Sequence, residues 1–416
     1  MITWRLGWRN LWRNPWRSFI TIASIASAFT FLIALCSLIE GLKRQLLANG
    51  TDLLTGHVQI HDAAYLPDRN LYDTLGGEGG TDWPGLLSSL AQQKQVLAAT
   101  PRVYAFGLLS TGDRSVGAEI LGVDPHRERM VTTLLQDLAS GNRDLDAGSR
   151  SIVLGVLLAR ELQARIGSEV AIVAQAADGT LANDLYRVTG ILRTGLTHYD
   201  RSLALLHRSD LQEFLVLDDR IHEVVIRSEN PLLAGGLARR LSHQDQFRGM
   251  SVQSWEDLSP QLKEYLGLTE GMAVFTISLV ALFAALGVLN TMLMAVFERT
   301  REIGLLNSLG MAPYQIVLSI LVESLFLGFM GLASGMVSGG LLMSYLSIHG
   351  WDLSRWTGEL SMLNSRIDPV LRAVWDWKLV FFSALGLAIA FLVATLLPAW
   401  RVARLSPVKA LAGPGA

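Results

Sequence analysis

Two histidines, His57 and His61, have the four-residue spacing of a metal-binding pair on a helix. The residues around them, 56–61, alternate polar and apolar types, which is typical of a half-buried strand. On a strand, four residues cover about 13 Å, from roughly 3.3 Å per residue. That separation is too large for one ion, so we predict no metal site here.

Motifs of common catalytic sites are missing from the sequence. It holds no Gly-x-Ser-x-Gly elbow, no His-Glu-x-x-His and no Gly-x-x-x-x-Gly-Lys-Ser/Thr phosphate loop. The single cysteine, Cys36, excludes an internal disulfide framework and a cysteine-rich metal site. We therefore expect no enzyme activity in this chain, and any nucleotide that drives it must bind to another chain.

Composition indicates a membrane protein, since 50% of residues are hydrophobic and only 17% are charged. A helix that crosses a bilayer needs about 20 apolar residues, and four segments meet that length. We predict an α-helical membrane protein with four transmembrane helices and a large mixed α/β periplasmic domain inserted between helices 1 and 2. The net charge of −2 does not favour nucleic-acid binding. The predicted spans are residues 18–40, 271–297, 315–347 and 378–400.

Basic residues flank the spans on one side, which predicts the orientation. With four spans, segments 1–17, 298–314 and 401–416 are cytoplasmic in a bacterial inner membrane. The domain 41–270 and the loop 348–377 are then periplasmic. The basic residues are Arg5, Arg9, Arg13, Arg17, Arg299, Arg301, Arg401, Arg404 and Lys409.

The N-terminal segment, 1–17, is expected to form an amphipathic helix in the headgroup layer. Trp4, Trp8 and Trp12 are each followed by an arginine, as is Trp16. A spacing of four keeps the indoles near one face of a helix, where they can anchor it at the interface.

The periplasmic domain, 41–270, shows both strand and helix patterns, which predicts a mixed α/β fold. Residues 103–123 predict a pair of strands, whereas 83–99 and 152–166 predict helices. We expect an inserted subdomain at about 149–217.

The polar segment between the second and third spans is predicted to form a short helix over residues 298–309. Ile303, Leu306 and Leu309 would share one face, and the charges crowd its first turns. Gly310 suits the position after the last turn. Such a helix can fit a groove on a soluble partner and pass its motion to both spans.

Two features of the third span bear on packing. Gly331, Gly335 and Gly339 form a small-residue face that permits close helix contact, either within the chain or at a dimer interface. Glu323 lies about two turns inside the span, where an unpaired carboxylate is costly. We expect it to pair with a basic residue near the cytoplasmic boundary rather than to couple an ion.

The stretch ERTREIGLLNSLGM resembles the cytoplasmic signature of the FtsX/MacB/LolCE family of ABC transporter permeases. The basic N-terminus with Arg-Asn before the first span, the large external domain, the three clustered C-terminal spans and the Ser-Pro-Val-Lys-Ala-Leu ending match that family in the same order. The signature is matched by Glu298, Arg299, Arg301, Glu302, Ile303, Gly304, Leu309 and Gly310.

The resemblance implies a permease that works by mechanotransmission with a cytoplasmic ABC ATPase dimer and a second permease subunit, identical or homologous. ATP and Mg²⁺ would bind to the ATPase, and this chain would bind no cofactor. The helix at 298–314 would couple the ATPase to the spans.

Within that family, the size and the early first span look more like the members that release lipoproteins, so the resemblance favours release of a lipoprotein or another hydrophobic substrate. An FtsX-like regulator of a periplasmic hydrolase, or MacB-like efflux, is the alternative. Substrate would gain access between the first two spans, near Leu35, Leu38, Ile39, Leu42, Met272, Phe275 and Leu279.

Overall fold

The structure, a computed structural model, describes residues 12–77, 80–136, 138–141, 145–298, 305, 311–352, 361–362, 365–366 and 370–403. The chain divides into two compact units. The helical unit comprises Met1–Lys43, Leu266–Trp356 and Pro369–Ala416, and the α/β unit comprises Arg44–Tyr265 and Thr357–Asp368.

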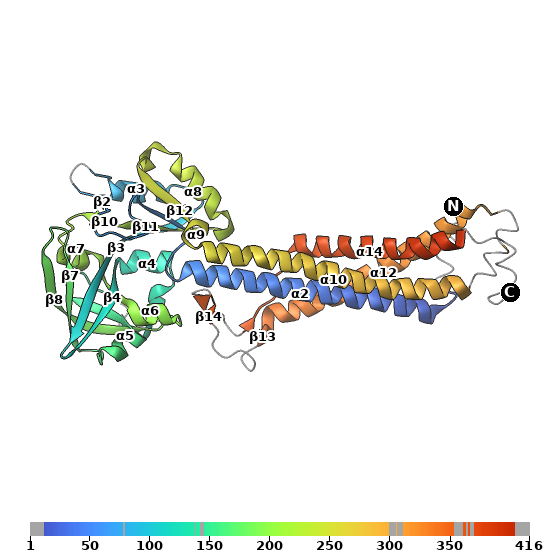
Figure 1. Cartoon of the computed structure of the whole chain (residues 1–416), viewed down its shortest axis with the longest axis horizontal. Helices are drawn as coiled ribbons and strands as arrows, with labels where there is room; N and C mark the ends of the chain where they lie inside the picture. The colour runs from blue at the N-terminus through green and yellow to red at the C-terminus, as the bar shows by residue number, and fades with distance from the viewer. Residues whose placement is uncertain are drawn as a thin grey trace. The chain divides into compact units, whose positions relative to one another are not determined.

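Four long helices build the helical unit and lie side by side (Figure 1). Each holds a stretch long and apolar enough to cross a membrane, which agrees with the four predicted spans. The first helix runs beyond residue 40 to Asp52, through Gly41 and Gly50, and no proline interrupts the stretch that follows the apolar span. The helices are α2 (Pro15–Asp52), α10 (Pro260–Glu298), α12 (Pro313–His349) and α14 (Trp377–Ala403).

The centre of the helical unit is apolar. Phe29, Leu32 and Ile33 of α2 pack against Met343 of α12 and Leu387 of α14. Large apolar side chains also remain exposed on the outer helix faces, as a lipid-facing surface requires. They include Phe275, Phe329 and Phe381.

The three glycines of the third span face α2 within the same unit. A Cβ atom added at Gly335 would lie 2.9 Å from the carbonyl oxygen of Ala26. Additions at Gly331 and Gly339 would approach Ile25 and Ile33 to 2.7 and 2.8 Å. The structure therefore places this small-residue face in close helix packing inside the chain.

A ten-stranded sheet organises the α/β unit, with the order β12-β1-β11-β3-β4-β9-β6-β8-β5 and β7 pairing with β3 and β8. Most pairs are antiparallel, but β4 with β9 and β6 with β8 are parallel. The segment 149–217 contributes four of these strands to the sheet. The strands are β1 (Val58–Asp62), β3 (Val96–Thr111), β4 (Arg114–Val123), β5 (Leu138–Gly141), β6 (Ser151–Gly155), β7 (Glu169–Gln175), β8 (Leu181–Leu192), β9 (Leu203–His207), β11 (Glu223–Ser228) and β12 (Met250–Ser254).

Short helices and two-stranded pairs complete the fold. Helices of the α/β unit are α3 (Trp83–Ala91), α4 (Pro125–Val131), η1 (Leu134–Gln136), α5 (Val156–Glu161), α6 (Thr197–Ser202), α7 (Arg208–Phe214), η2 (Pro231–Leu233), α8 (Ala234–Ser242), η3 (Asp245–Phe247) and α9 (Trp255–Leu258). The small pairs are β2 (Leu75–Gly76) with β10 (Arg220–Ile221), β13 (Trp351–Asp352) with β16 (Val370–Leu371), and β14 (Ser361–Met362) with β15 (Ser365–Arg366).

Strand predictions fared better than helix predictions in this unit. The expected pair within 103–123 is confirmed as the β3–β4 hairpin, whose turn places Gly112 at φ +57°. The helix expected over 152–166 is wrong in its first part, which is the fully buried strand β6. A short apolar run that is buried on both faces has no alternation to distinguish it from a helix. The helix expected over 83–99 ends early, since β3 begins at Val96.

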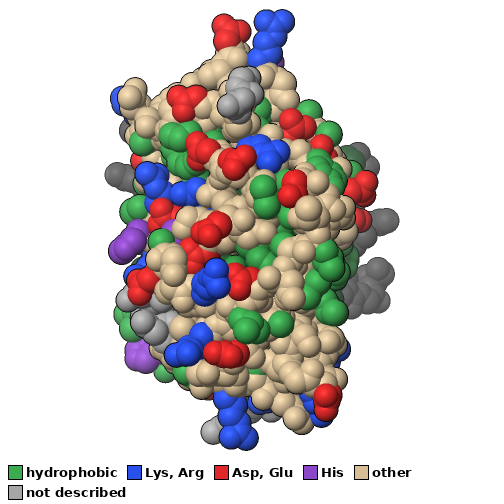
Figure 2. Space-filling model, turned by 90° about the vertical axis from the view of Figure 1, so that its left-hand side faces the viewer, with side chains coloured by type: hydrophobic (Ala, Val, Ile, Leu, Met, Phe, Trp, Pro, Cys, Tyr) green, Lys and Arg blue, Asp and Glu red, His purple; other side chains and the backbone are tan. Residues whose placement is uncertain are grey.

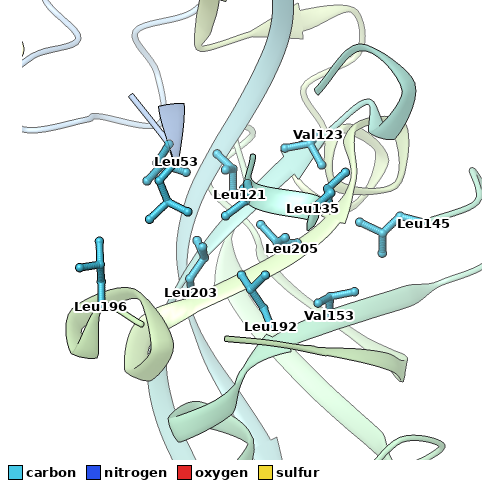
Figure 3. Close-up of a cluster of buried hydrophobic side chains, with 12 residues drawn as sticks. Leu53, Leu121, Val123, Leu135, Leu145, Val153, Leu192, Leu196, Leu203 and Leu205 are labelled. Carbon is cyan, nitrogen blue, oxygen red and sulfur yellow. The ribbon is translucent and has the colours of Figure 1, made fainter. Parts of the chain in front are cut away.

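The core of the α/β unit is a cluster of buried leucines and valines (Figure 3). Leu121 and Val123 of β4, Leu203 and Leu205 of β9, and Leu192 of β8 all contribute to it. Burying such a side chain stabilises the fold by roughly 1.5–3 kcal/mol. The sheet is thus held by contacts between strands that are far apart in the sequence.

His222 is a buried histidine of this unit whose charge state matters to stability. Its Nδ1 accepts the backbone N–H of Tyr104, and its Nε2 lies 3.1 Å from the carbonyl oxygen of Leu71. Burial lowers the pKa of His222 to about 4, so the folded unit holds it neutral at pH 7.

Acidification is therefore expected to destabilise the α/β unit through His222. In the unfolded chain the pKa is about 6.5, so between pH 6.5 and 4 only the unfolded state takes up the proton. The free energy of unfolding should fall by about 3 kcal/mol over that interval. Hydrogen exchange of β3 and β11 at several pH values measures this fall. His222→Gln should lose most of it, whereas His126→Gln, at an exposed site, serves as the control; equal pH dependence in both variants would contradict the prediction.

Candidate substrate cleft and coupling site

A cleft of about 380 Å³ lies among α2, α10 and the start of α14 in the helical unit. Its wall is apolar, with Ile39 from α2, Ala273, Val274 and Ile277 from α10, and Phe382 from α14. The helical spacing of the three α10 residues puts them on one face of that helix. The cleft can therefore take an apolar chain between the helices.

Charged side chains surround this apolar wall. Lys43 Nζ lies 2.7 Å from Glu270 Oε1 and joins α2 to α10 at the rim. Asp376 Oδ1 accepts the N–H of Lys378 at 2.8 Å, which caps the start of α14. An apolar wall with a rim of both charges suits an amphipathic ligand that carries a hydrocarbon part and a polar head.

The structure brings only part of the predicted access region to this cleft. Ile39 lines it, and Leu38 is buried in the helical core at 7% exposure. Met272, Phe275 and Leu279 lie elsewhere on α10, exposed at 63%, 68% and 40%. Leu35 and Leu42, on α2, are half-buried and do not line the cleft.

A second cavity in the helical unit, of about 210 Å³, is wholly apolar and lies among α2, α12 and α14. Its lining includes Ile25, Phe329 and Phe391. It offers no polar group to orient a ligand, so the cleft with the charged rim is the stronger candidate for recognition.

The predicted coupling helix lies mostly outside the described residues. Arg299, Arg301, Glu302, Ile303, Gly304, Leu306, Leu309 and Gly310 all fall there. Of the predicted coupling residues, Glu298 is described as the last residue of α10 and is exposed. Leu305, inside the same segment, is also exposed. The next helix, α12, begins at Pro313.

Arg17, near the start of α2, contacts two carboxylates on two other helices. Its Nη1 lies 3.4 Å from Glu298 Oε2, at the end of α10. Its Nη2 lies 3.4 Å from Glu323 Oε1, on α12. The expected basic partner of Glu323 is thus present, and it also reaches Glu298, the first residue of the predicted coupling segment.

Of the two histidines considered for metal binding, His57 is bound through both ring nitrogens, whereas His61 has a contact from Nδ1 to the carbonyl oxygen of Asp62 at 2.8 Å. His57 Nδ1 lies 2.9 Å from Ser228 Oγ and accepts the Ser228 N–H, while Nε2 lies 3.0 Å from Asp52 Oδ1. Ser228 is only 3% exposed, so this Ser-His-Asp line braces α2 against β1 and β11. Among the described residues, no group of three or more His, Cys, Asp or Glu could hold a metal ion.

The face of the α/β unit drawn in Figure 2 carries acidic and basic side chains interspersed with hydrophobic ones.

The rim residues Lys43, Glu270, Asp376 and Lys378 were not identified from the sequence. A signal for them existed, because charged residues at the ends of apolar helices lie where a bilayer meets water. Their pairing across helices could not be read from spacing, since Lys43 and Glu270 are separated by more than two hundred positions.

Comparison with known proteins places these units in context. A family described as MacB-like periplasmic core domain matches residues 18–242, and one described as FtsX-like permease C-terminal matches residues 274–407. The first of these covers more than half of the chain.

Individual proteins show the same likeness. The chain is 28% identical over 412 residues to the lipoprotein-releasing system transmembrane protein LolC of Neisseria meningitidis, covering 95% of this chain and 94% of that one. It is 24% identical over 409 residues to the macrolide export ATP-binding/permease protein MacB of Sodalis glossinidius, covering 94% of this chain and 57% of that one. The periplasmic region of MacB from Actinobacillus actinomycetemcomitans aligns with a TM-score of 0.36 at 13% identity, over 52% of this chain and 95% of that one.

Four membrane-length helices, a mixed α/β domain after the first of them and matches to both family domains agree with one another. The chain belongs to the FtsX/MacB/LolCE family of ABC transporter permeases.

Proposed function

We propose that this chain is the permease subunit of an ATP-driven complex that extracts a hydrophobic or lipidated substrate at the periplasmic face of a bacterial inner membrane, with lipoprotein release as the favoured activity. The observation that carries the proposal is the likeness to a LolC over 95% of this chain and 94% of the relative. Because the match spans both units, it supports a mechanism shared by the whole chains rather than a likeness confined to one domain.

ATP would be used by a separate subunit. The sequence has no phosphate loop, and a charged, short segment lies between α10 and α12 where an ATPase groove could receive it. A cytoplasmic ATPase dimer would hold ATP and Mg²⁺, and a second permease subunit, identical or homologous, would complete the complex. Both termini would then be cytoplasmic.

The cleft with the charged rim is the proposed site for the lipid part of the substrate. Acyl chains would contact Ala273, Val274 and Ile277, and the polar head would meet Lys43 and Glu270 at the rim. Each buried CH₂ contributes about 0.8 kcal/mol to such binding. Mechanical release would require ATP-driven movement of α2 relative to α10.

Narrowing the cleft is expected to reduce substrate binding. Ala273 is 4% exposed and faces the cleft, so Ala273→Phe should lower the amount of bound substrate by about tenfold, equivalent to losing about 1.4 kcal/mol. Met272→Phe is the matched control, because it adds a similar ring at the adjacent, 63% exposed position. Equal loss in both variants, or no loss in either, would remove the cleft from the proposal.

MacB-like efflux of peptides or small molecules is the second candidate. It is favoured by the MacB-like periplasmic core domain that spans residues 18–242. An FtsX-like complex that regulates a periplasmic hydrolase is the non-transporting alternative, supported by the match over residues 274–407.

Mass spectrometry of molecules that copurify with the complex separates these activities. The complex is isolated with its ATPase catalytically blocked, so that substrate is held before release. An acylated protein enriched over a complex with active ATPase is the expected result. A cell-wall hydrolase would instead favour the FtsX-like alternative, and a small molecule or unlipidated peptide the MacB-like one.

A further inference from the structure

We infer that Arg17 is a positioning residue for energy coupling. It ties the start of α2 to the end of α10 and to α12, a link that we call the latch. The three helices then move together when the adjoining ATPase-contacting segment moves. The inference rests on the proposed function and adds a route by which movement of that segment reaches α2. It depends on the geometry of Arg17, Glu298 and Glu323.

Arg17 contacts the end of α10 that leads into the predicted coupling segment. Glu298 is the last residue of α10 and the first residue of the stretch that resembles the coupling helix. Displacement of that segment can enter the bundle through the end of α10 as well as through the start of α12, at Pro313. Arg17, near the start of α2, contacts the end of α10, because its Nη1 lies 3.4 Å from Glu298 Oε2.

The shape of the arginine side chain allows it to contact both carboxylates. A guanidinium presents several N–H groups in a fixed plane, so one arginine can bind two acceptors in different directions. Arg17 uses Nη1 for Glu298 and Nη2 for Glu323. The cation thereby joins α2, α10 and α12, which no ion pair between two side chains could do.

Burial differs between the two contacts of Arg17: the inner arm, to Glu323, is more buried than the outer arm, to Glu298. The side chains of Arg17 and Glu323 are 18% and 10% exposed, whereas that of Glu298 is 46% exposed. The inner arm therefore lies in a lower dielectric, where an unpaired carboxylate is costly. The outer arm is close to solvent, and since both contacts are 3.4 Å long, exposure and not length distinguishes them. We assign to the inner arm the role of anchoring Arg17 on α12, and to the outer arm the role of transmitting movement between α10 and α2.

Arg17 and the cleft are connected through α2, so the latch can affect the cleft. Arg17 belongs to α2, and the same helix carries Ile39 and Lys43 at the cleft. A helix transmits displacement along its axis because its backbone hydrogen bonds keep it stiff. Movement that enters α2 at Arg17 therefore reaches the residues that would hold substrate.

Arg17→Lys tests the inference without removing the charge that Glu323 needs. A single ammonium group keeps the inner pair but cannot hold both carboxylates in the planar fork. The measurement is substrate released per ATP hydrolysed by the full complex in vesicles. We expect ATP hydrolysis within about twofold of the original protein and release per ATP reduced by about tenfold.

Further variants separate latching from folding. Glu298→Gln breaks only the exposed outer arm and should give the same loss of release per ATP as Arg17→Lys, with little added loss in the double variant, since both remove one interaction. The pair Arg17→Glu with Glu323→Arg restores the inner arm with reversed charges and should recover assembly relative to Arg17→Glu alone. Arg372→Lys, at an exposed arginine of the same unit, is the control that should not alter the ratio.

Each outcome has a distinct meaning. Unchanged release per ATP in Arg17→Lys and Glu298→Gln, while the original complex works, would overturn the inference and leave the proposed function intact. Parallel loss of assembly, ATP hydrolysis and release would show a merely structural role and overturn it as well. Absence of ATP-dependent release from the original complex would overturn the proposed function, and the inference with it.

Discussion

Replacing Glu302 with lysine is expected to abolish coupling while leaving the complex in the membrane. Glu302 lies in the segment between α10 and α12 that resembles the family's coupling helix, and it follows Arg301 in a dense run of charges. Reversing its charge would place a cation where an ATPase groove is expected to meet an anion. Charge reversal at such a contact costs enough to reduce ATP-dependent release by about tenfold or more.

Glu264→Lys is the matched control for this prediction, because it makes the same charge change at an exposed residue of α10 far from the segment in sequence. Release per ATP and the amount of ATPase that copurifies should both fall in Glu302→Lys and remain unchanged in Glu264→Lys. Normal release from an assembled Glu302→Lys complex would remove the coupling assignment.

Replacing Arg102 with methionine is expected to destabilise the α/β unit more than any other substitution considered. Arg102 is 1% exposed and binds Glu128 through Nε at 3.1 Å. Its Nη1 donates to the carbonyl oxygen of Leu54 at 2.6 Å and lies 3.4 Å from Glu223 Oε1. Removing the arginine leaves two buried carboxylates without their cation, which costs about 3–5 kcal/mol.

Hydrogen exchange of peptides from β3, β11 and α4 measures this loss where it occurs. Exchange of their slowest amides should accelerate by about two to four orders of magnitude. Arg201→Met is the control, because the Arg201–Glu161 pair is exposed at 61% and 41% and such surface pairs contribute about 0–1 kcal/mol. Similar exchange in the two variants would mean that the buried cluster contributes little.

The membrane helices could be predicted from the sequence because each one is specified locally. An uninterrupted apolar run of about 20 residues has few alternatives to a spanning helix. The turn at Gly112 was equally local, since a positive φ there favours glycine. The extension of α2 to Asp52 was not predicted, because the prediction ended the helix with the apolar run, whereas the structure continues it through Gly41 and Gly50.

Contacts between distant residues could not be predicted in the same way. Strand β6 looked helical because its burial on both faces depends on β8 and β9, which lie far along the chain. The partner of Glu323 was predictable as a basic residue near the membrane boundary, but not as Arg17. The residues that line the cleft differ from the predicted ones for a related reason. Apolarity identified α10 as a wall of the substrate site, but the packing of α2 and α14 decides that Ala273, and not Met272, faces the cleft.

The central claim is that a separate ATPase drives this chain to release a lipidated substrate, and reconstitution tests it most directly. Vesicles containing this chain, its copurifying partner subunits and an acylated protein are supplied with ATP, and the acylated protein released to the outside is measured. The account predicts release that requires both this chain and the ATPase, and that stops when the ATPase is catalytically blocked. Release by this chain without the ATPase, or no release of acylated protein by the complete complex with ATP, would contradict it.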